Sequence, residues 1–244
     1  MIRAMVFDLD GTLVQTERLK AISYARAAIE LCPHHLTEDE VIAAFKEVVG
    51  LSRREVALAL VERFDLGPKA DARRDELGVD TPWQAYVQIR LGIYQEMLKD
   101  PEVIRRNQWP HTMQLLDKAR ETGCQTALAT MSYREQASRV LQILDLTAAF
   151  DFIATRDDVD KGKPDPEIYH LVSRELAIPP EECLVIEDSP SGVTAALAAN
   201  MHVIAVSTPF TRAGLHALDD LDPRWLVDDP DDLLPLVTEA FRAI

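Results

Sequence analysis

The chain has few cysteines, little positive charge and no long apolar run. Its three cysteines, Cys32, Cys124 and Cys183, are scattered without the spacing of a metal site, and we expect buried, reduced thiols. No apolar stretch approaches the ~20 residues that cross a bilayer. In MIRAMVFDLDG, charged residues interrupt the first apolar stretch too early for a signal peptide. These absences predict a cytoplasmic protein without a membrane partner.

The shortage of basic residues also bears on partners. The sequence holds 26 Lys and Arg against 41 Asp and Glu, a net charge of −15, which argues against nucleic acid because phosphate backbones attract a basic surface. Residues 16–107 are nearly balanced, with 14 basic against 16 acidic residues, and the rest holds 12 against 25. This difference in net charge between the two parts has two interpretations. It is either chance variation between solvated surfaces, or the cations of the 16–107 segment face an anionic substrate. Both interpretations stay open.

The segment 17–99 has the periodicity of helices alone. Ser52 and Glu55 form a capping box at the start of one helix, and Thr81-Pro82 starts another. Between them, residues 66–80 read as a solvated connection. We therefore predict an inserted helical domain over 16–107.

The remainder alternates short apolar runs with helices. The runs lie at 4–10, 124–130, 150–155, 182–188, 202–207 and 225–229, and a helix capped by Ser132 with Glu135 is expected between two of them. Apolar runs without alternation, separated by helices, predict a parallel sheet covered on both faces. The fold class is therefore α/β, with a core of residues 1–15 and 108–244. No strand is followed by GxGxxG, which excludes a dinucleotide-dependent dehydrogenase.

Polar residues collect where these runs end. The first run ends in VFDLDGTLV, with two aspartates one residue apart on the same face of an extended chain. Two such charges at ~4 Å repel by roughly 4 kcal/mol at an effective dielectric of ~20, so a divalent cation is expected between them. Because ligands bind outside the carboxyl ends of parallel strands, later runs should add Thr130, Lys163 and the pair Glu187-Asp188 to the same edge.

These motifs resemble those of the haloacid dehalogenase superfamily. The match comprises VFDLDGTLV, the strand-end LAT, GKPDP and IEDSPSG, which occur in the family's order and span essentially the whole chain. The helical insert after the first strand resembles the cap of phosphoglycolate-phosphatase-like and β-phosphoglucomutase-like members. The resemblance implies a Rossmann-like core with an inserted helical cap.

The resemblance also implies roles for the strand-end residues. Asp8 is expected to attack phosphorus and form an aspartyl-phosphate, and Asp10 to protonate the leaving group and then activate water. Lys163 is expected to balance charge and Thr130 to hydrogen-bond a phosphoryl oxygen. The implied cofactor is Mg²⁺, held by Asp8, Asp10 and Asp188, with Glu187 as an alternative or supporting ligand.

A further set of residues is expected to bind substrate. Gly11 and Thr12 would direct backbone N–H groups at the phosphate, and Met131 and Ser132 follow Thr130 directly. In the insert, Lys20, Arg53 and Arg90 stand where sugar-phosphate-handling relatives contact substrate. For the two arginines, a merely solvated role stays open.

We therefore predict a Mg²⁺-dependent phosphatase that acts on a small phosphorylated metabolite, with a β-phosphoglucomutase-type phosphomutase as the alternative. Lys20 stands where many sugar-phosphate members carry a histidine, which favours hydrolysis. A non-catalytic binding module stays open, whereas a receiver domain is excluded because its phosphorylated Asp lies on a middle strand and it has no insert. The sequence leaves open whether the protein is a monomer or a dimer.

Overall fold

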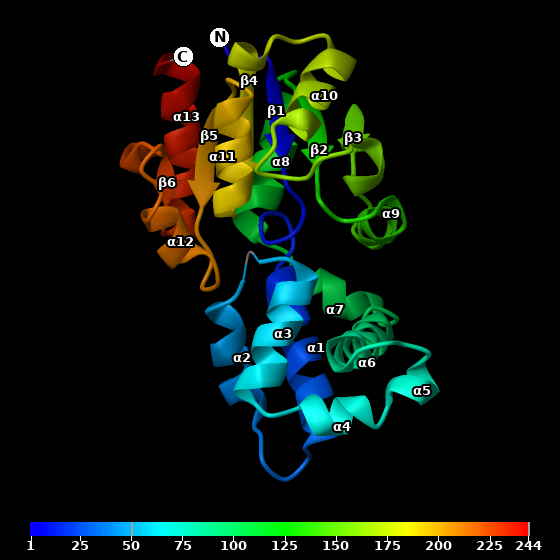
Figure 1. The fold of residues 1–244 in the computed structure, drawn as a ribbon. Coiled ribbons are helices and arrows are strands. Elements are labelled where there is room, and N and C mark those ends of the chain that lie inside the picture. Colours follow the sequence, from blue (N-terminus) through cyan, green and yellow to red (C-terminus); the bar gives the residue numbers. More distant parts are fainter. Residues whose placement is uncertain (50, 244) are drawn as a thin grey trace. The chain divides into compact units, whose positions relative to one another are not determined.

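In the computed structural model, which describes residues 1–49 and 51–243, the six apolar runs form one parallel sheet (Figure 1). The strand order is β3-β2-β1-β4-β5-β6. This arrangement confirms the α/β prediction. The strands are β1 (Ala4–Phe7), β2 (Gln125–Ala129), β3 (Phe152–Ala154), β4 (Cys183–Glu187), β5 (His202–Val206) and β6 (Leu226–Val227).

The register of the central strands brings their carboxyl ends to one edge. Phe7, the last residue of β1, pairs with Leu128 of β2 and with Ile186 of β4. The residues that follow these three positions therefore emerge side by side. The buried strands have no polar alternation because helices cover both faces of the sheet.

One face carries α10 (Glu167–Leu176) and α11 (Pro190–Ala198), whose apolar residues join the strands in one buried cluster. Helix α8 (Pro110–Glu121) packs against β2, and α13 (Leu233–Ala243) contacts α8. The remaining elements of this unit are α9 (Arg134–Ile143), α12 (Arg212–His216) and four 3₁₀ turns at Arg156–Asp158, Pro180–Glu182, Pro223–Trp225 and Pro230–Asp232.

The described chain divides into two compact units. The first combines Met1–Gln15 with the chain from Ile104 onward, and the second is Thr16–Val103. The second unit contains α1 (Thr16–Leu31), α2 (Glu38–Lys46), α3 (Arg53–Arg63), α4 (Gly67–Asp71), α5 (Arg74–Leu77) and α6 (Pro82–Met97), and α7 (Pro101–Arg105) spans the junction. That residues 16–107 form a domain separate from residues 1–15 and 108–244 remains a prediction.

Within the second unit, α1 packs against α2 and α6. Tyr24 lies at the centre of an aromatic cluster, with ring centroids 5.4 Å from Phe45 and 5.7 Å from Tyr86. The hydroxyl of Tyr86 donates to the backbone oxygen of Tyr24 at 2.8 Å, so the buried phenol is satisfied.

Two helix starts lie where the local sequence signals predict them. Ser52 and Glu55 form the expected capping box, and α6 begins at Pro82 as predicted. Residues 66–80 are mostly exposed, as a solvated connection requires, but they also form the short helices α4 and α5, which the prediction missed; Leu66 and Ala70 are fully buried and anchor them.

Two further local expectations are corrected by the structure. Ser132 does not cap the following helix, which begins at Arg134 with Tyr133 before it and no side-chain cap. Of the cysteines, only Cys183 is buried, whereas Cys32 and Cys124 are partly exposed free thiols. None of the helices described is long and apolar enough to span a membrane.

Candidate active site

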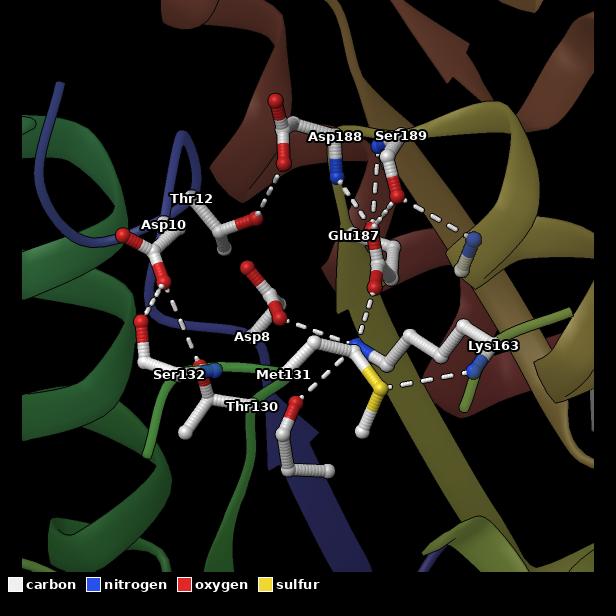
Figure 2. Close-up of polar contacts among 12 residues, drawn as sticks. Asp8, Asp10, Thr12, Thr130, Met131, Ser132, Lys163, Glu187, Asp188 and Ser189 are labelled. Atoms are coloured by element: carbon white, nitrogen blue, oxygen red, sulfur yellow. Dashed lines mark hydrogen bonds and ion pairs between the residues drawn. The ribbon is translucent and has the colours of Figure 1, made fainter. Parts of the chain in front are cut away.

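Polar side chains from four segments meet beyond the carboxyl ends of β1, β2 and β4 (Figure 2). Asp8 follows β1 directly, Thr130 follows β2, and Glu187 is the last residue of β4. Lys163 comes from the loop before α10 and reaches the same place. These four residues therefore lie together at one edge of the sheet, as predicted.

Lys163 lies at the centre of this group. Its Nζ donates to Asp8 Oδ1 at 2.8 Å, to the backbone oxygen of Ala129 at 3.0 Å and to Glu187 Oε1. The lysine side chain is 3% exposed. Two buried carboxylates thus share one buried cation, which is the pairing that makes buried charge tolerable.

Glu187 has both oxygens occupied. Oε1 accepts from Lys163 and from the Tyr169 hydroxyl at 3.2 Å, and Oε2 accepts from the backbone N–H groups of Asp188 and Ser189, each at 2.9 Å, and from the Ser189 hydroxyl. A carboxylate offers about four lone-pair positions, so little capacity remains for a further ligand. Gly192 makes room for this arrangement, because a Cβ there would lie 1.8 Å from Oε1.

Asp10 faces a different set of partners. Its Oδ2 accepts from the Ser132 hydroxyl and, at 3.4 Å, from the Thr130 hydroxyl. The Thr130 oxygen also accepts the Ser132 backbone N–H at 3.0 Å. The segment after β2 therefore holds the second aspartate of the motif, which explains why Ser132 is turned toward the site instead of capping α9.

Gly11, Thr12 and Asp188 form the other side of the site. Gly11 has a φ of +91°, a conformation that glycine adopts without strain, and a Cβ there would lie 2.1 Å from Asp188 Oδ2. The Thr12 hydroxyl donates to Asp188 Oδ1 at 3.4 Å, and the Thr12 backbone oxygen accepts from Thr112 at 2.6 Å. Glycine is thus required here both for the turn and for the space.

The charges at the site act on each other strongly. Burial raises the pKa of Asp8 well above its usual value, Lys163 opposes the rise, and Glu187 and Asp10 add to it. Burial lowers the pKa of Lys163, but the opposite effect of Asp8 and Glu187 is larger, so the pKa is well above its usual value. Lys163 therefore stays charged, and a cation beside Asp8 would hold that carboxylate ionised.

Three carboxylates are placed to hold such a cation. Asp8, Glu187 and Asp188 each offer an oxygen, and these oxygens all lie within 4.8 Å of one another. An all-oxygen donor set suits a hard divalent cation, and the missing Cβ of Gly11 leaves room beside Asp188. Because the Glu187 oxygens already accept five hydrogen bonds, Asp8 and Asp188 are the better ligands of the three.

The other expected substrate-binding residues lie in several places. Met131 directs its sulfur at the backbone N–H of Lys163, at 3.4 Å (Figure 2). Lys20, Arg53 and Arg90 belong to the helical unit Thr16–Val103. Gly50, which opens the GLSRRE loop, lies outside the described residues.

Arg90 is the most buried of these cap residues, at 4% exposed. Its guanidinium carbon lies 4.9 Å from the ring centroid of Tyr24 and 4.7 Å from that of Tyr94. Its Nε has no hydrogen-bond partner among the described residues, and the groups that act on its pKa are tyrosines and Arg53, not carboxylates. Burial accordingly lowers the pKa of Arg90.

Three residues at the site were not singled out from the sequence. Tyr169 is fully buried and supports Glu187, Thr112 holds the Thr12 backbone, and Ser189 caps α11 while donating to Glu187. Ser189 had a visible signal in IEDSPSG, directly before Pro190. Tyr169 and Thr112 read as ordinary helix residues, and only the tertiary contacts identify them.

Comparison with known proteins agrees with the motifs. A model of haloacid dehalogenase-like hydrolases matches residues 2–200. The chain is 31% identical over 203 residues to a phosphorylated carbohydrates phosphatase of Thermotoga maritima, covering 83% of this chain and 84% of that protein.

Solved structures give the same picture. A putative β-phosphoglucomutase from Thermotoga maritima is 27% identical with a TM-score of 0.70, covering 98% of this chain and 99% of that one. A HAD family hydrolase from Deinococcus radiodurans, with bound phosphate and sodium, is 25% identical with a TM-score of 0.74, covering 98% and 96%. With its four motifs in order and meeting at one sheet edge, the chain belongs to the haloacid dehalogenase-like hydrolase family.

Proposed function

We propose that this protein is a Mg²⁺-dependent phosphatase that hydrolyses a small phosphorylated metabolite through an aspartyl-phosphate on Asp8. The observation that carries the proposal is the Asp8 carboxylate, held 2.8 Å from Lys163 Nζ and grouped with Asp188 in a set of oxygens that suits a divalent cation. A carboxylate so placed is a nucleophile with its charge already balanced.

In the first half of the reaction, Asp8 attacks phosphorus and the ester oxygen leaves. Lys163 neutralises charge on the phosphoryl oxygens, and the Thr130 hydroxyl and the backbone N–H groups that follow Asp10 bind them. The bound cation supplies further charge neutralisation and orientation of the phosphoryl group. Asp8, the Asp10 backbone carbonyl and Asp188 would hold it.

Asp10 is the proton donor for the leaving oxygen and then the base that activates water. Its hydrogen bonds from Ser132 and Thr130 orient the carboxyl group, which follows the nucleophile by two residues. Donor and base roles in succession require a group that changes protonation during the cycle. Asp8 stays bonded to phosphorus in between, so the two aspartates have separate tasks.

The substrate is a sugar phosphate or a short phosphoglycolate-like ester. The relative from Thermotoga maritima is named for phosphorylated carbohydrates, which supports this class for the present chain. Residues of the helical segment 16–107 contribute to the choice of substrate in this proposal. The nearly balanced charge of this segment, against the acidic remainder, favours the approach of an anionic substrate.

The burial of Arg90 favours a substrate that carries an anionic group. A buried cation without an acidic partner costs several kcal/mol, and contact with two tyrosine faces offsets only part of this cost. Arg53 acts electrostatically on both Arg90 and Tyr24, and Lys20 acts on Tyr24 as well. We therefore assign Lys20, Arg53 and Arg90 to the binding of a negatively charged or hydroxyl-bearing part of the substrate.

Phosphomutase activity of the β-phosphoglucomutase type is the alternative, because it uses the same residues and returns the phosphoryl group to a second hydroxyl. The similarity to a putative β-phosphoglucomutase keeps it in view. Lys20 in place of the family's histidine favours hydrolysis. A cytoplasmic location is part of the proposal and rests on the three free thiols.

The test is a panel of phosphorylated metabolites assayed for phosphate release with Mg²⁺ and again with a chelator. We expect release from at least one sugar or short-chain phosphate, lost with chelator and restored by added Mg²⁺. Turnover that is indifferent to the chelator would remove the metal from the proposal. Isomerisation of a sugar phosphate with little free phosphate would establish the mutase instead.

A further inference from the structure

Lys163 is held at both ends of its residue. At one end, Nζ is fixed by Asp8, by Glu187 and by the backbone oxygen of Ala129 at 3.0 Å. At the other end, the backbone N–H of Lys163 donates to the sulfur of Met131 at 3.4 Å. A lysine stem is long and flexible, so the position of its backbone matters for where the ammonium can stay.

The approach of the sulfur depends on Gly162. A Cβ at this position would lie 3.0 Å from Met131 Sδ, which is tighter than ordinary contact. Met131 is also packed against the buried cluster formed by the sheet with α10 and α11. An unbranched thioether can fill an irregular gap and still turn its sulfur to a donor, which a branched side chain of the same size cannot.

Both contacts come from the same strand end. Ala129 is the last residue of β2 and Met131 follows two residues later, so one short segment binds both the ammonium and the backbone of Lys163 (Figure 2). The residue between them, Thr130, contacts Asp10. The end of β2 therefore sets the position of the Lys163 ammonium group relative to Asp8 and Asp10.

We infer that Met131 is a positioning residue for Lys163, acting through the hydrogen bond that its sulfur accepts, and that it does not itself contact the substrate. The reaction in question is the phosphatase of the proposed function, on which this inference rests. Loss of the acceptor loosens the loop and lowers the fraction of enzyme in which the ammonium balances Asp8.

The experiment compares Met131→Leu and Met131→Gln with the wild-type enzyme. Leucine keeps the volume and removes the acceptor, whereas glutamine has a similar length and offers an amide oxygen to the same N–H. We expect Met131→Leu to lower kcat about 3- to 10-fold with KM unchanged, and Met131→Gln to retain most of the activity. Met113→Leu, at a partly buried methionine of α8, is the matched control and should leave kcat and KM unchanged.

Hydrogen–deuterium exchange at the Lys163 amide gives a readout that needs no substrate. We expect faster exchange in Met131→Leu than in the wild type or in Met113→Leu, with protection regained in Met131→Gln. Unchanged exchange and kcat in Met131→Leu would overturn the inference. A rise in KM alone would also overturn it, because the side chain would then contact substrate. If the wild type hydrolyses no phosphate ester, the proposed function fails, and the exchange result alone decides the role of Met131.

Discussion

Lys163 Nζ lies 2.8 Å from Asp8 Oδ1, although 155 residues separate the two in the chain. Both side chains are buried and nothing in local sequence links them. The contact exists because the loop between β3 and α10, which carries Lys163, leaves the same edge of the parallel sheet as the end of β1.

Asp8→Asn should abolish Mg²⁺-dependent phosphate release, with kcat lowered by at least about 10⁴-fold, because an amide cannot form the acyl phosphate. Asp10→Asn should lose nearly as much, since it removes the proton donor. Initial rates of phosphate release measure both. Asp219→Asn, at an exposed aspartate, is the control and should keep full activity. Turnover retained in Asp8→Asn would remove the covalent mechanism.

Lys163→Met should lower both activity and stability. The substitution leaves Asp8 and Glu187 buried without their cation, which costs about 3–5 kcal/mol of unfolding free energy. Urea unfolding in the presence of chelator measures the loss. Burial raises the pKa of Asp8, and the variant lacks the Lys163 charge that opposes this rise. The unfolded chain releases the Asp8 proton at a lower pH than the folded variant does. The stability deficit should therefore grow as pH rises from the unfolded-state pKa towards the raised folded-state pKa.

Lys161→Met is the matched control for this substitution. Lys161 lies two residues away, its side chain is 74% exposed, and it pairs with Asp165 at 3.4 Å, so little stability should be lost. Equal urea midpoints for the two variants would contradict the assignment of Lys163 as the buried counter-charge.

Gly11→Ala should impair binding of the cation. Its Cβ would lie 2.1 Å from Asp188 Oδ2 and would displace that carboxylate, in addition to straining a φ of +91°. Gly123→Ala shares the backbone strain, with a φ of +79°, but its Cβ would meet nothing within 4 Å. Both should lose roughly 1–2 kcal/mol of stability from the left-handed conformation. Only Gly11→Ala should require more Mg²⁺ for half-maximal activity. The same Mg²⁺ requirement in both variants would contradict this role for Asp188.

Arg90→Met should separate binding from stability. Because we assign the buried guanidinium to a charged or hydroxyl-bearing part of the substrate, its removal should raise KM at least about 10-fold for the sugar phosphate or phosphoglycolate-like ester that the enzyme hydrolyses best, and leave p-nitrophenyl phosphate turnover within about 2-fold. The folded enzyme should be no less stable, since an apolar side chain replaces an unpaired buried cation. Arg54→Met, at an exposed arginine 5.8 Å from the Trp83 ring, is the control. Unchanged KM with a large loss of stability would make Arg90 structural.

Much of this organisation could be read in the sequence because it depends on local or repeating signals. Buried parallel strands show as uninterrupted apolar runs, and the residues that end them must share one edge once the strands are parallel. Asp8, Thr130, Lys163 and Glu187 could therefore be grouped before their contacts were known. The Ser52 capping box and the Pro82 helix start were visible for the same reason, since their partners lie within three residues.

Other features were decided only by tertiary structure. Residues 66–80 look polar, yet two buried side chains turn them into helices, and Ser132 resembles a helix cap but instead turns to Asp10. Packing between segments far apart in the chain decides which donors bind the Glu187 carboxylate. It also places the Met131 sulfur next to the backbone N–H of Lys163. The amino-acid sequence by itself determined which chemical groups reach the sheet edge, because strand periodicity is local. Only the folded chain decided how each group is oriented, because a side chain's direction depends on neighbours that no local pattern specifies.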